Sequence, residues 1–220
     1  KFAAFVDELL ERALVRVYLF GNYDRAFAET MAQRIREGLP ARSDSAPGYA
    51  RKRFYAPESG KTVTYNTDLP VDDLGMMLLY ASPEPSVESE AAGRVLARHL
   101  RNRAFDTLRT EEQLGYAAGG IATTLQDHPV IGFYIQTPVK GPVEMLARFE
   151  AFTEEYGKTL EALSADQFAN LKSGVLTALT EPPTNLADEA GPFLSDWNRE
   201  RYEFGSRQQM IAAVEAVTID

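Results

Sequence analysis

The two histidines, His99 and His128, are the residues here that most often serve proteins as metal ligands or proton carriers. A catalytic zinc site of the His-x-x-Glu-His kind needs two ligands one helical turn apart, with a carboxylate base beside them. Neither that order nor the reverse, His-Glu-x-x-His, occurs in the sequence. His99 lies on an apolar stripe with Val95 and Leu100, which predicts a structural histidine, and His128 lies in a predicted turn before a proline. The sequence therefore predicts no metal site in this chain.

The sequence also lacks the motifs of nucleophilic catalysis and of phosphate binding. The chain has no cysteine and no Gly-x-Ser-x-Gly elbow. The glycines Gly115, Gly119 and Gly120 lack the lysine and the spacing of a phosphate-binding loop. We expect them to let a strand bend or another backbone approach closely. No complete catalytic constellation can be built, so we expect no catalytic residue in this chain.

The composition is that of an ordinary globular protein with an acidic surface. Of the 220 residues, 45% are hydrophobic and 25% are charged, and the formal net charge is −9. Negative charge repels nucleic-acid phosphates, so we expect no nucleic-acid partner. The acidic pairs Asp72-Asp73 and Glu111-Glu112 have diverging side chains and are expected to be solvated. No apolar run approaches the roughly 20 residues that cross a bilayer. The first residue, Lys1 in place of Met, predicts a fragment of a longer polypeptide.

The first 50 residues predict a small helix–strand–helix unit followed by a linker. Apolar residues at helical spacing predict a helix over 2–13, and the β-rich stretch 14–20 predicts a strand. A second helix is expected over 24–39. This unit is incomplete, because a lone strand leaves its backbone groups unpaired. Residues 41–50 are rich in proline, glycine and serine and are the best candidate for a linker.

The remaining chain predicts an antiparallel sheet covered by helices. Strands are expected over 61–67, 74–82, 115–125 and 130–137, with a helix over 86–105 between the second and the third. Pro142 predicts a helix start, and Ser164 with Gln167 three residues later forms a capping-box signal for the next helix. Strands first and helices after, with hairpin-like pairs, predict an α+β fold with helices on one face of a mainly antiparallel sheet.

The most informative segment is Phe105-Asp-Thr-Leu-Arg-Thr-Glu-Glu-Gln-Leu-Gly-Tyr116. It resembles the Leu-Arg-Thr-x-Glu-Gln-Leu-Gly-Tyr signature in the C-terminal half of the pitrilysin/insulinase (M16) zinc metallopeptidases. Three further features resemble the family in the same order along most of the chain: Gly21-Asn22, Gln136-Thr137, and Trp197 followed by Tyr202-Glu-Phe204. Ala117-Ala118 departs from the bulkier residues usual after the tyrosine, which predicts either a more loosely packed strand or a roomier groove.

The resemblance implies a role in a larger enzyme. It implies the end of one family domain at 1–40, the linker at 41–50, and a C-terminal inactive domain at 51–220. Zinc and the catalytic acid would lie in the N-terminal half of the same polypeptide, whereas this half completes the substrate chamber. Arg109 and Tyr116 match the family's substrate-contacting arginine and tyrosine. A guanidinium can hold backbone oxygens, and a phenol can donate to an oxyanion.

The resemblance leaves two other functions open. The family fold also serves as an inactive scaffold or assembly subunit, and a free-standing peptide-binding module is a third possibility. The retention of both Arg109 and Tyr116 favours the peptidase, and the unpaired stretch 14–20 disfavours the free-standing module. The absence of cysteine fits cytoplasm or periplasm, and the resemblance slightly favours a bacterial periplasmic protein. Gln113, Leu114 and Gly115 are expected to shape the loop.

Overall fold

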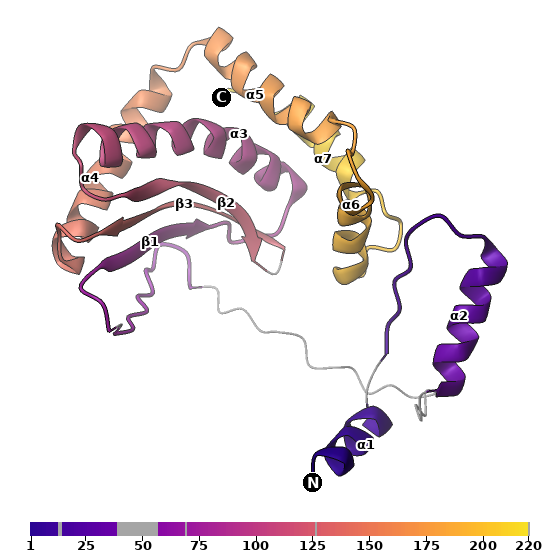
Figure 1. Ribbon diagram of the computed structural model, residues 1–220. Coiled ribbons are helices and arrows are strands. Elements are labelled where there is room, and N and C mark those ends of the chain that lie inside the picture. The colour runs from indigo at the N-terminus through magenta and orange to yellow at the C-terminus, as the bar shows by residue number, and fades with distance from the viewer. Residues whose placement is uncertain (13–14, 39–56, 69, 126, 220) are drawn as a thin grey trace. The chain divides into compact units, whose positions relative to one another are not determined.

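A computed structural model describes residues 1–12, 15–38, 57–68, 70–125 and 127–219 (Figure 1). The described elements, in chain order, are the helices α1 (Phe2–Arg12) and α2 (Arg25–Gly38), the strand β1 (Leu74–Ala81), the helix α3 (Val87–Ala104), the π-helix η1 (Phe105–Glu111), the strands β2 (Ala117–Leu125) and β3 (His128–Thr137), and the helices α4 (Pro142–Glu161), α5 (Ala165–Thr180), α6 (Leu186–Asn198) and α7 (Ser206–Ala216). None of the described helices is both long and apolar enough to cross a membrane.

The chain divides into two compact units, which are described separately. The smaller unit comprises residues 1–53 and 183–205, and the larger unit comprises residues 54–182 and 206–220. The segment that carries α6 therefore groups with the N-terminal segment rather than with its neighbours in sequence. The predicted division into the end of one family domain and a following domain stays a prediction, and the predicted linker 41–50 lies outside the described residues.

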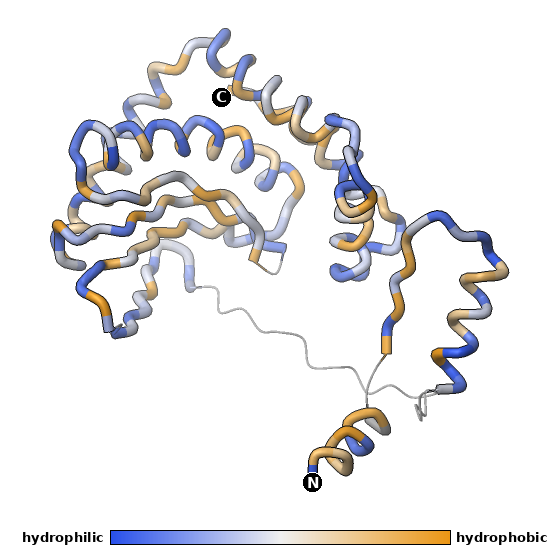
Figure 2. The backbone as a smooth tube through the Cα atoms, viewed as in Figure 1, coloured by the Kyte–Doolittle hydropathy of each residue, from blue (hydrophilic) through white to orange (hydrophobic). Residues whose placement is uncertain are grey.

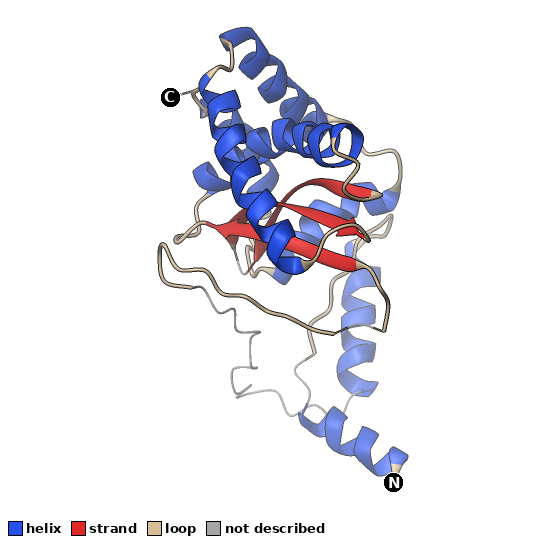
Figure 3. Cartoon of the chain, turned by 90° about the vertical axis from the view of Figure 1, so that its left-hand side faces the viewer, coloured by secondary structure: helices blue, strands red, loops and turns tan. Residues whose placement is uncertain are grey.

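The larger unit is built on a three-stranded antiparallel sheet in the order β1-β3-β2, shown in red in Figure 3. β3 is central and pairs with β1 from Leu74↔Thr137 to Ala81↔Val130, and with β2 from Ala117↔Gln136 to Leu125↔His128. The mainly antiparallel α+β class predicted from the sequence is confirmed. Figure 2 shows apolar stretches along the three strands, whereas α3 carries many hydrophilic residues.

The core lies on one face of this sheet, beneath α3 and α4. Phe133 of β3 meets the rings of Phe149 and Phe152 of α4 edge-on, with centroids 4.7 and 5.2 Å apart. Such T-shaped contacts suit the ring quadrupoles and add to the burial of apolar area. A second buried cluster joins α3 to α5 and α7 through Val95, Val175 and Val214. α3 is therefore buried against the sheet on one side and against helices on the other.

The smaller unit is held by aromatic contacts between α6 and the segment before α2. Tyr18 packs on Trp197 with ring centroids 5.9 Å apart, and Phe20 stacks on Phe193 at 5.5 Å. The guanidinium of Arg16 lies 4.1 Å from the Trp197 ring and donates to its main-chain oxygen over 2.6 Å. Residues 15–20 are thus anchored by side chains and are not part of a strand.

Two of the predicted strands do not form in the residues that the structure describes. Residues 15–20 are extended but have no neighbouring strand among the described residues, so the strand of the predicted helix–strand–helix piece does not form. The stretch 61–67 alternates in sequence, yet Val63 and Tyr65 are 57% and 87% exposed. Alternation makes a strand only where one face is buried, and this stretch buries none.

Other predicted elements are correct within a few residues. β1 and α3 lie where the apolar run and the helical period predict them. The capping box at Ser164 and Gln167 is present, with Gln167 N to Ser164 Oγ at 3.2 Å. The turn between β2 and β3 differs slightly, because His128 pairs with Leu125 as part of β3.

Candidate functional site

A π-helical turn carries Arg109 to the surface. α3 changes at Phe105 into η1, whose wider turn is closed by Glu112 N donating to the Thr107 oxygen over 3.0 Å. Leu108 is fully buried in the core and anchors this turn, while the neighbouring Arg109 is exposed. π-helical turns are rare and occur frequently at functional sites. The sequence predicted the end of a helix at residue 105 but not the π-helix that follows it, because no residue pattern is specific to this wider turn.

Arg109 is held by two contacts that leave part of its guanidinium available. Its guanidinium carbon lies 4.7 Å from the centre of the Phe105 ring, a cation–π contact. Its Nε donates to the main-chain oxygen of Tyr116 over 3.1 Å. Among the described residues, no hydrogen bond or ion pair of its two terminal amino groups is present. Arg109 therefore offers a planar pair of donors at a fixed place.

The loop between Arg109 and Tyr116 is shaped by tight backbone packing. Gln113 takes a left-handed conformation with φ of 53°, and Leu114 turns inward and is buried. The Thr137 hydroxyl donates to the Leu114 oxygen, which ties the loop to the end of β3. A Cβ at Gly115 would lie 2.1 Å from the Gln136 oxygen, so only glycine fits there. The loop-shaping role predicted for these residues matches their positions.

Tyr116 is exposed, yet its hydroxyl is engaged. Its side chain is 56% exposed, and its O–H donates to a carboxylate oxygen of Asp73, the residue just before β1. Gln136 Nε2 donates to the same oxygen over 3.0 Å. The hydrogen bond to Asp73 raises the pKa of Tyr116, with smaller contributions from burial and from the charge of Asp73. The phenol therefore stays protonated at neutral pH.

Two acids that were expected to be solvated have specific partners instead. Asp73 is half-buried and accepts hydrogen bonds from Tyr116 and Gln136. Glu112 forms a two-fold contact with Arg148 of α4, at 2.8 and 2.5 Å. Each of these acids is far in sequence from the residues that it contacts, so the adjacency of the acidic residues could not predict these contacts. Asp73 belongs to the candidate site although it was not predicted from the sequence.

The histidines lie elsewhere in structural roles. His99 is half-buried on α3 with Nδ1 3.0 Å from the Tyr156 hydroxyl, and burial, with a smaller effect of Arg103, lowers its pKa. The Nδ1 of His128 lies 3.0 Å from the Ser82 oxygen. Within the described part of the chain, no three His, Cys, Asp or Glu side chains gather as metal ligands would.

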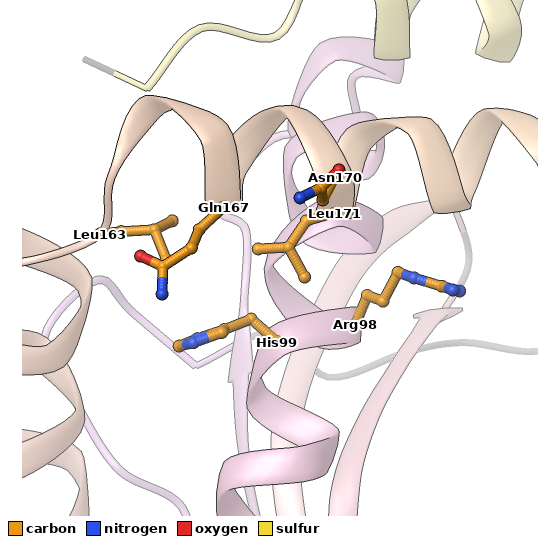
Figure 4. A pocket seen from close by; sticks show the side chains of 6 residues that line it. All are labelled: Arg98, His99, Leu163, Gln167, Asn170 and Leu171. Atoms are coloured by element: carbon orange, nitrogen blue, oxygen red, sulfur yellow. The ribbon is translucent and has the colours of Figure 1, made fainter.

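A shallow hollow beside His99 is separate from the Arg109 and Tyr116 pair. Its volume is about 320 Å³, and α3, α5 and the turn before α5 line it. Figure 4 shows the imidazole of His99 pointing toward Leu163 and Gln167, whereas the guanidinium of Arg98 extends away from them. Because its polar groups diverge, this hollow offers no convergent set for a ligand.

The site that remains consists of Arg109, Tyr116 and Asp73 at one end of the sheet. It combines two exposed amino donors, a neutral phenol and one carboxylate. These groups can bind and orient a polar chain. They include neither a nucleophile poised beside a base nor a metal-ligand set among the described residues. The arrangement is suited to binding.

Known proteins resemble this chain in sequence and fold. The protein-family model described as PQQ synthase PqqF-like, C-terminal lobe domain 4, matches residues 95–194 of this chain. Protease 3 of Escherichia coli strain K12 is 25% identical over 215 residues, which cover 98% of this chain and 22% of that protein. The crystal structure of pitrilysin superposes with a TM-score of 0.79 and 25% identity, over 90% of this chain and 21% of that chain.

A third similarity concerns the fold alone. The peptidase M16 inactive domain from Pseudomonas fluorescens is 19% identical, with a TM-score of 0.53, over 91% of this chain and 50% of that chain. This chain therefore spans about a fifth of the length of the Protease 3 and pitrilysin chains that it matches.

Proposed function

The chain belongs to the pitrilysin/insulinase (M16) metallopeptidase family, within its non-catalytic C-terminal half, and from this premise we propose that it holds peptide substrate for a bacterial zinc endopeptidase. In this proposal it completes a substrate chamber whose catalytic half belongs to the same polypeptide. The peptide would be bound through Arg109 and Tyr116. The periplasm is the compartment that we propose for the bacterial enzyme.

One observation carries the proposal. Arg109 and Tyr116 are joined by the Nε to main-chain oxygen bond of 3.1 Å, and both side chains are exposed at the end of the sheet. The spare amino groups of Arg109 can donate to two carbonyl oxygens or bidentately to a carboxylate. Tyr116 adds a second polar contact at a fixed distance along the same loop. A peptide in extended conformation offers such groups at regular spacing.

Zinc does not fit the described residues of this chain, since no suitable set of ligands comes together in them. We therefore place the zinc of the proposed enzyme in its other half and assign no step of peptide hydrolysis to this chain. The contribution of Arg109 and Tyr116 is to bind and orient the peptide. Preformed donors of this kind stabilise charge that develops on a carbonyl oxygen without having to reorganise.

The test is peptide cleavage by the full-length protein with Arg109→Ala or Tyr116→Phe. Each variant should lose about a hundredfold in kcat/KM, equivalent to about 2.7 kcal/mol. Arg94→Ala is the matched control, because Arg94 is an exposed arginine on α3 that pairs with Glu90 on its own helix. It should cleave normally. Normal cleavage by stable Arg109 and Tyr116 variants would reject the assignment, and an inactive wild-type protein would favour a scaffold.

A further inference from the structure

The sheet of the larger unit has a second face, opposite to the core, which we call the open face. Gly120 of β2 lies on the core face, because a Cβ there would be 2.7 Å from the main-chain nitrogen of Arg101 in α3 (Figure 1). Side chains alternate between the two faces along each strand. With the strand register, this alternation places four large side chains on the open face: Met77, Leu79, Ile121 and Tyr134.

Rows of paired residues cross the open face, starting beside the candidate site. The first row is Gly75, Gln136 and Ala117, the second is Met77, Tyr134 and Gly119, and the third is Leu79, Gly132 and Ile121. The Tyr134 ring lies over Gly119, where an added Cβ would be 3.2 Å from the Tyr134 hydroxyl oxygen. Because Gly132 lies between Leu79 and Ile121, the middle of the third row has no side chain. The large side chains of the open face therefore lie beside positions that carry none.

The open face is apolar although solvent reaches it. Met77 is 57% exposed and Leu79 is 41% exposed. The strands β1, β2 and β3 contain no aspartate, glutamate, lysine or arginine, whereas these residues make up 25% of the whole chain. The two buried clusters of the described residues include none of the four large side chains of this face. Contiguous exposed apolar surface of this kind marks interaction sites.

The position and the size of the open face indicate what it binds. It is continuous with the candidate site, because Gln136 of the first row donates to the Asp73 oxygen that also accepts from the Tyr116 hydroxyl. Three strands of eight to ten residues, spaced about 4.8 Å apart, cover roughly 400 Å². Each partner in a stable protein–protein interface buries about 800 Å². The open face therefore suits part of a peptide held at Tyr116 better than a second copy of this chain.

We propose that the open face binds one large apolar side chain of the peptide held at the candidate site, through Met77, Leu79 and Tyr134. This inference rests on the proposed function and specifies its substrate class. The second and third rows lie about 7 and 13 Å from Gln136 along β3, and an extended peptide covers these distances in about two to four residues. The preferred substrate therefore carries leucine, phenylalanine or a similar residue about two to four positions from the residue held at Tyr116.

The preference is measured in the full-length protein with a series of peptides that carry one leucine, placed at each position in turn, and serine at the others. In the wild type, leucine at one position should raise kcat/KM about tenfold, the lower end of the effect of burying one such side chain. Leu79→Ser and Met77→Ser should each reduce this preference to about threefold or less. Leu194→Ser is the matched control, because Leu194 of α6 is a leucine that is 40% exposed, and it should keep the preference.

The contact itself is measured without cleavage. Peptides with benzoylphenylalanine at each position in turn are photo-crosslinked to the full-length protein in the presence of a zinc chelator, and the labelled residue is identified by mass spectrometry. For one position the label should be on Met77 or Leu79, and an excess of the leucine peptide should remove it. This readout in the wild type holds even if Leu79→Ser fails to fold.

The possible results separate this inference from the proposed function. A leucine preference that is the same in the wild type, Met77→Ser and Leu79→Ser would overturn the inference, as would a label outside the open face or no label at all. Dimerisation of the wild type that Met77→Ser abolishes would assign the face to a second copy and overturn it too. A competed label on Met77 in a protein that cleaves no peptide would reject the peptidase role but retain the peptide contact.

Discussion

The Nε of Arg109 donates to the main-chain oxygen of Tyr116 over 3.1 Å, so one hydrogen bond sets the spacing of both candidate contact residues. The bond uses Nε of the guanidinium and leaves its two amino groups without a hydrogen-bond partner among the described residues. Because Gly115 is pressed against the Gln136 oxygen, the carbonyl of Tyr116 is also tied to β3. The position of Arg109 is therefore set by the sheet, through the contacts of this loop.

Arg109→Lys should abolish this arrangement while keeping the charge. A lysine has a single ammonium group and cannot hold the Tyr116 oxygen and present two further donors in a plane. We expect kcat/KM of the full-length protein to fall nearly as far as in Arg109→Ala. The free energy of unfolding should change by less than about 0.5 kcal/mol, because the side chain is exposed. Arg94→Lys is the control, and cleavage retained by Arg109→Lys would show that charge alone suffices.

Gly132→Ala tests how tightly the sheet is packed. A Cβ at Gly132 would lie 2.0 Å from the Leu78 oxygen of the paired strand, so β1 and β3 must separate to admit it. We expect a loss of about 1–3 kcal/mol in the free energy of unfolding, measured with urea. Gly93→Ala on α3 is the matched change, with no atom within 4 Å of the added carbon. It should stabilise the chain by about 0.5–1 kcal/mol, and a similar result for both glycines would contradict the packing argument.

Arg148→Met tests the connection between α4 and the loop after η1. Arg148 contacts both oxygens of Glu112 and is also 3.0 Å from Glu155, and its side chain is only 16% exposed. Losing a two-fold, partly buried contact should cost about 1–3 kcal/mol. Glu112→Gln should cost a comparable amount, whereas Glu155→Gln should cost less than about 0.5 kcal/mol because Glu155 is more exposed. A double-mutant cycle by urea unfolding measures the coupling, and a coupling near zero for Arg148 with Glu112 would contradict this.

The sequence predicted the elements whose patterns are local. The apolar run at β1, the helical period of α3 and the capping box of Ser164 with Gln167 each carry their own signal, and the structure contains all three. The nine-residue signature identified the loop of Arg109 and Tyr116. The stretch 61–67 also alternates locally, but a strand needs a buried face, which no local pattern guarantees.

Contacts between distant residues were beyond local patterns. Asp73 and Tyr116 are 43 residues apart, and the hydrogen bond between them depends on β1 and β2 flanking the same central strand. The acidic pair of Asp72 and Asp73 therefore looked like solvated surface. Likewise, the turn at η1 widens where Leu108 is drawn into the core, and this depends on the packing of α4 and the sheet.

His99 should make the stability of the chain depend on pH in the weakly acidic range. Burial, and to a smaller extent the charge of Arg103, lowers the pKa of His99 in the folded state below its unfolded value of about 6.5. The unfolded state then binds the proton more readily, so stability is complete above that value and falls as pH drops through it. The fall ends below the folded pKa.

The measurement is the free energy of unfolding of wild type and His99→Gln between about pH 7.5 and pH 5, the window around that unfolded value. The wild type should lose more stability than the variant over this range, because only the wild type has the His99 imidazole to protonate. The carboxylates contribute equally to both curves. Tyr156→Phe removes the hydroxyl 3.0 Å from Nδ1 but keeps the burial, so it should retain the steeper wild-type dependence. Parallel curves for wild type and His99→Gln would show that His99 titrates alike in both states, and loss of the dependence in Tyr156→Phe would assign it to the hydroxyl instead of burial.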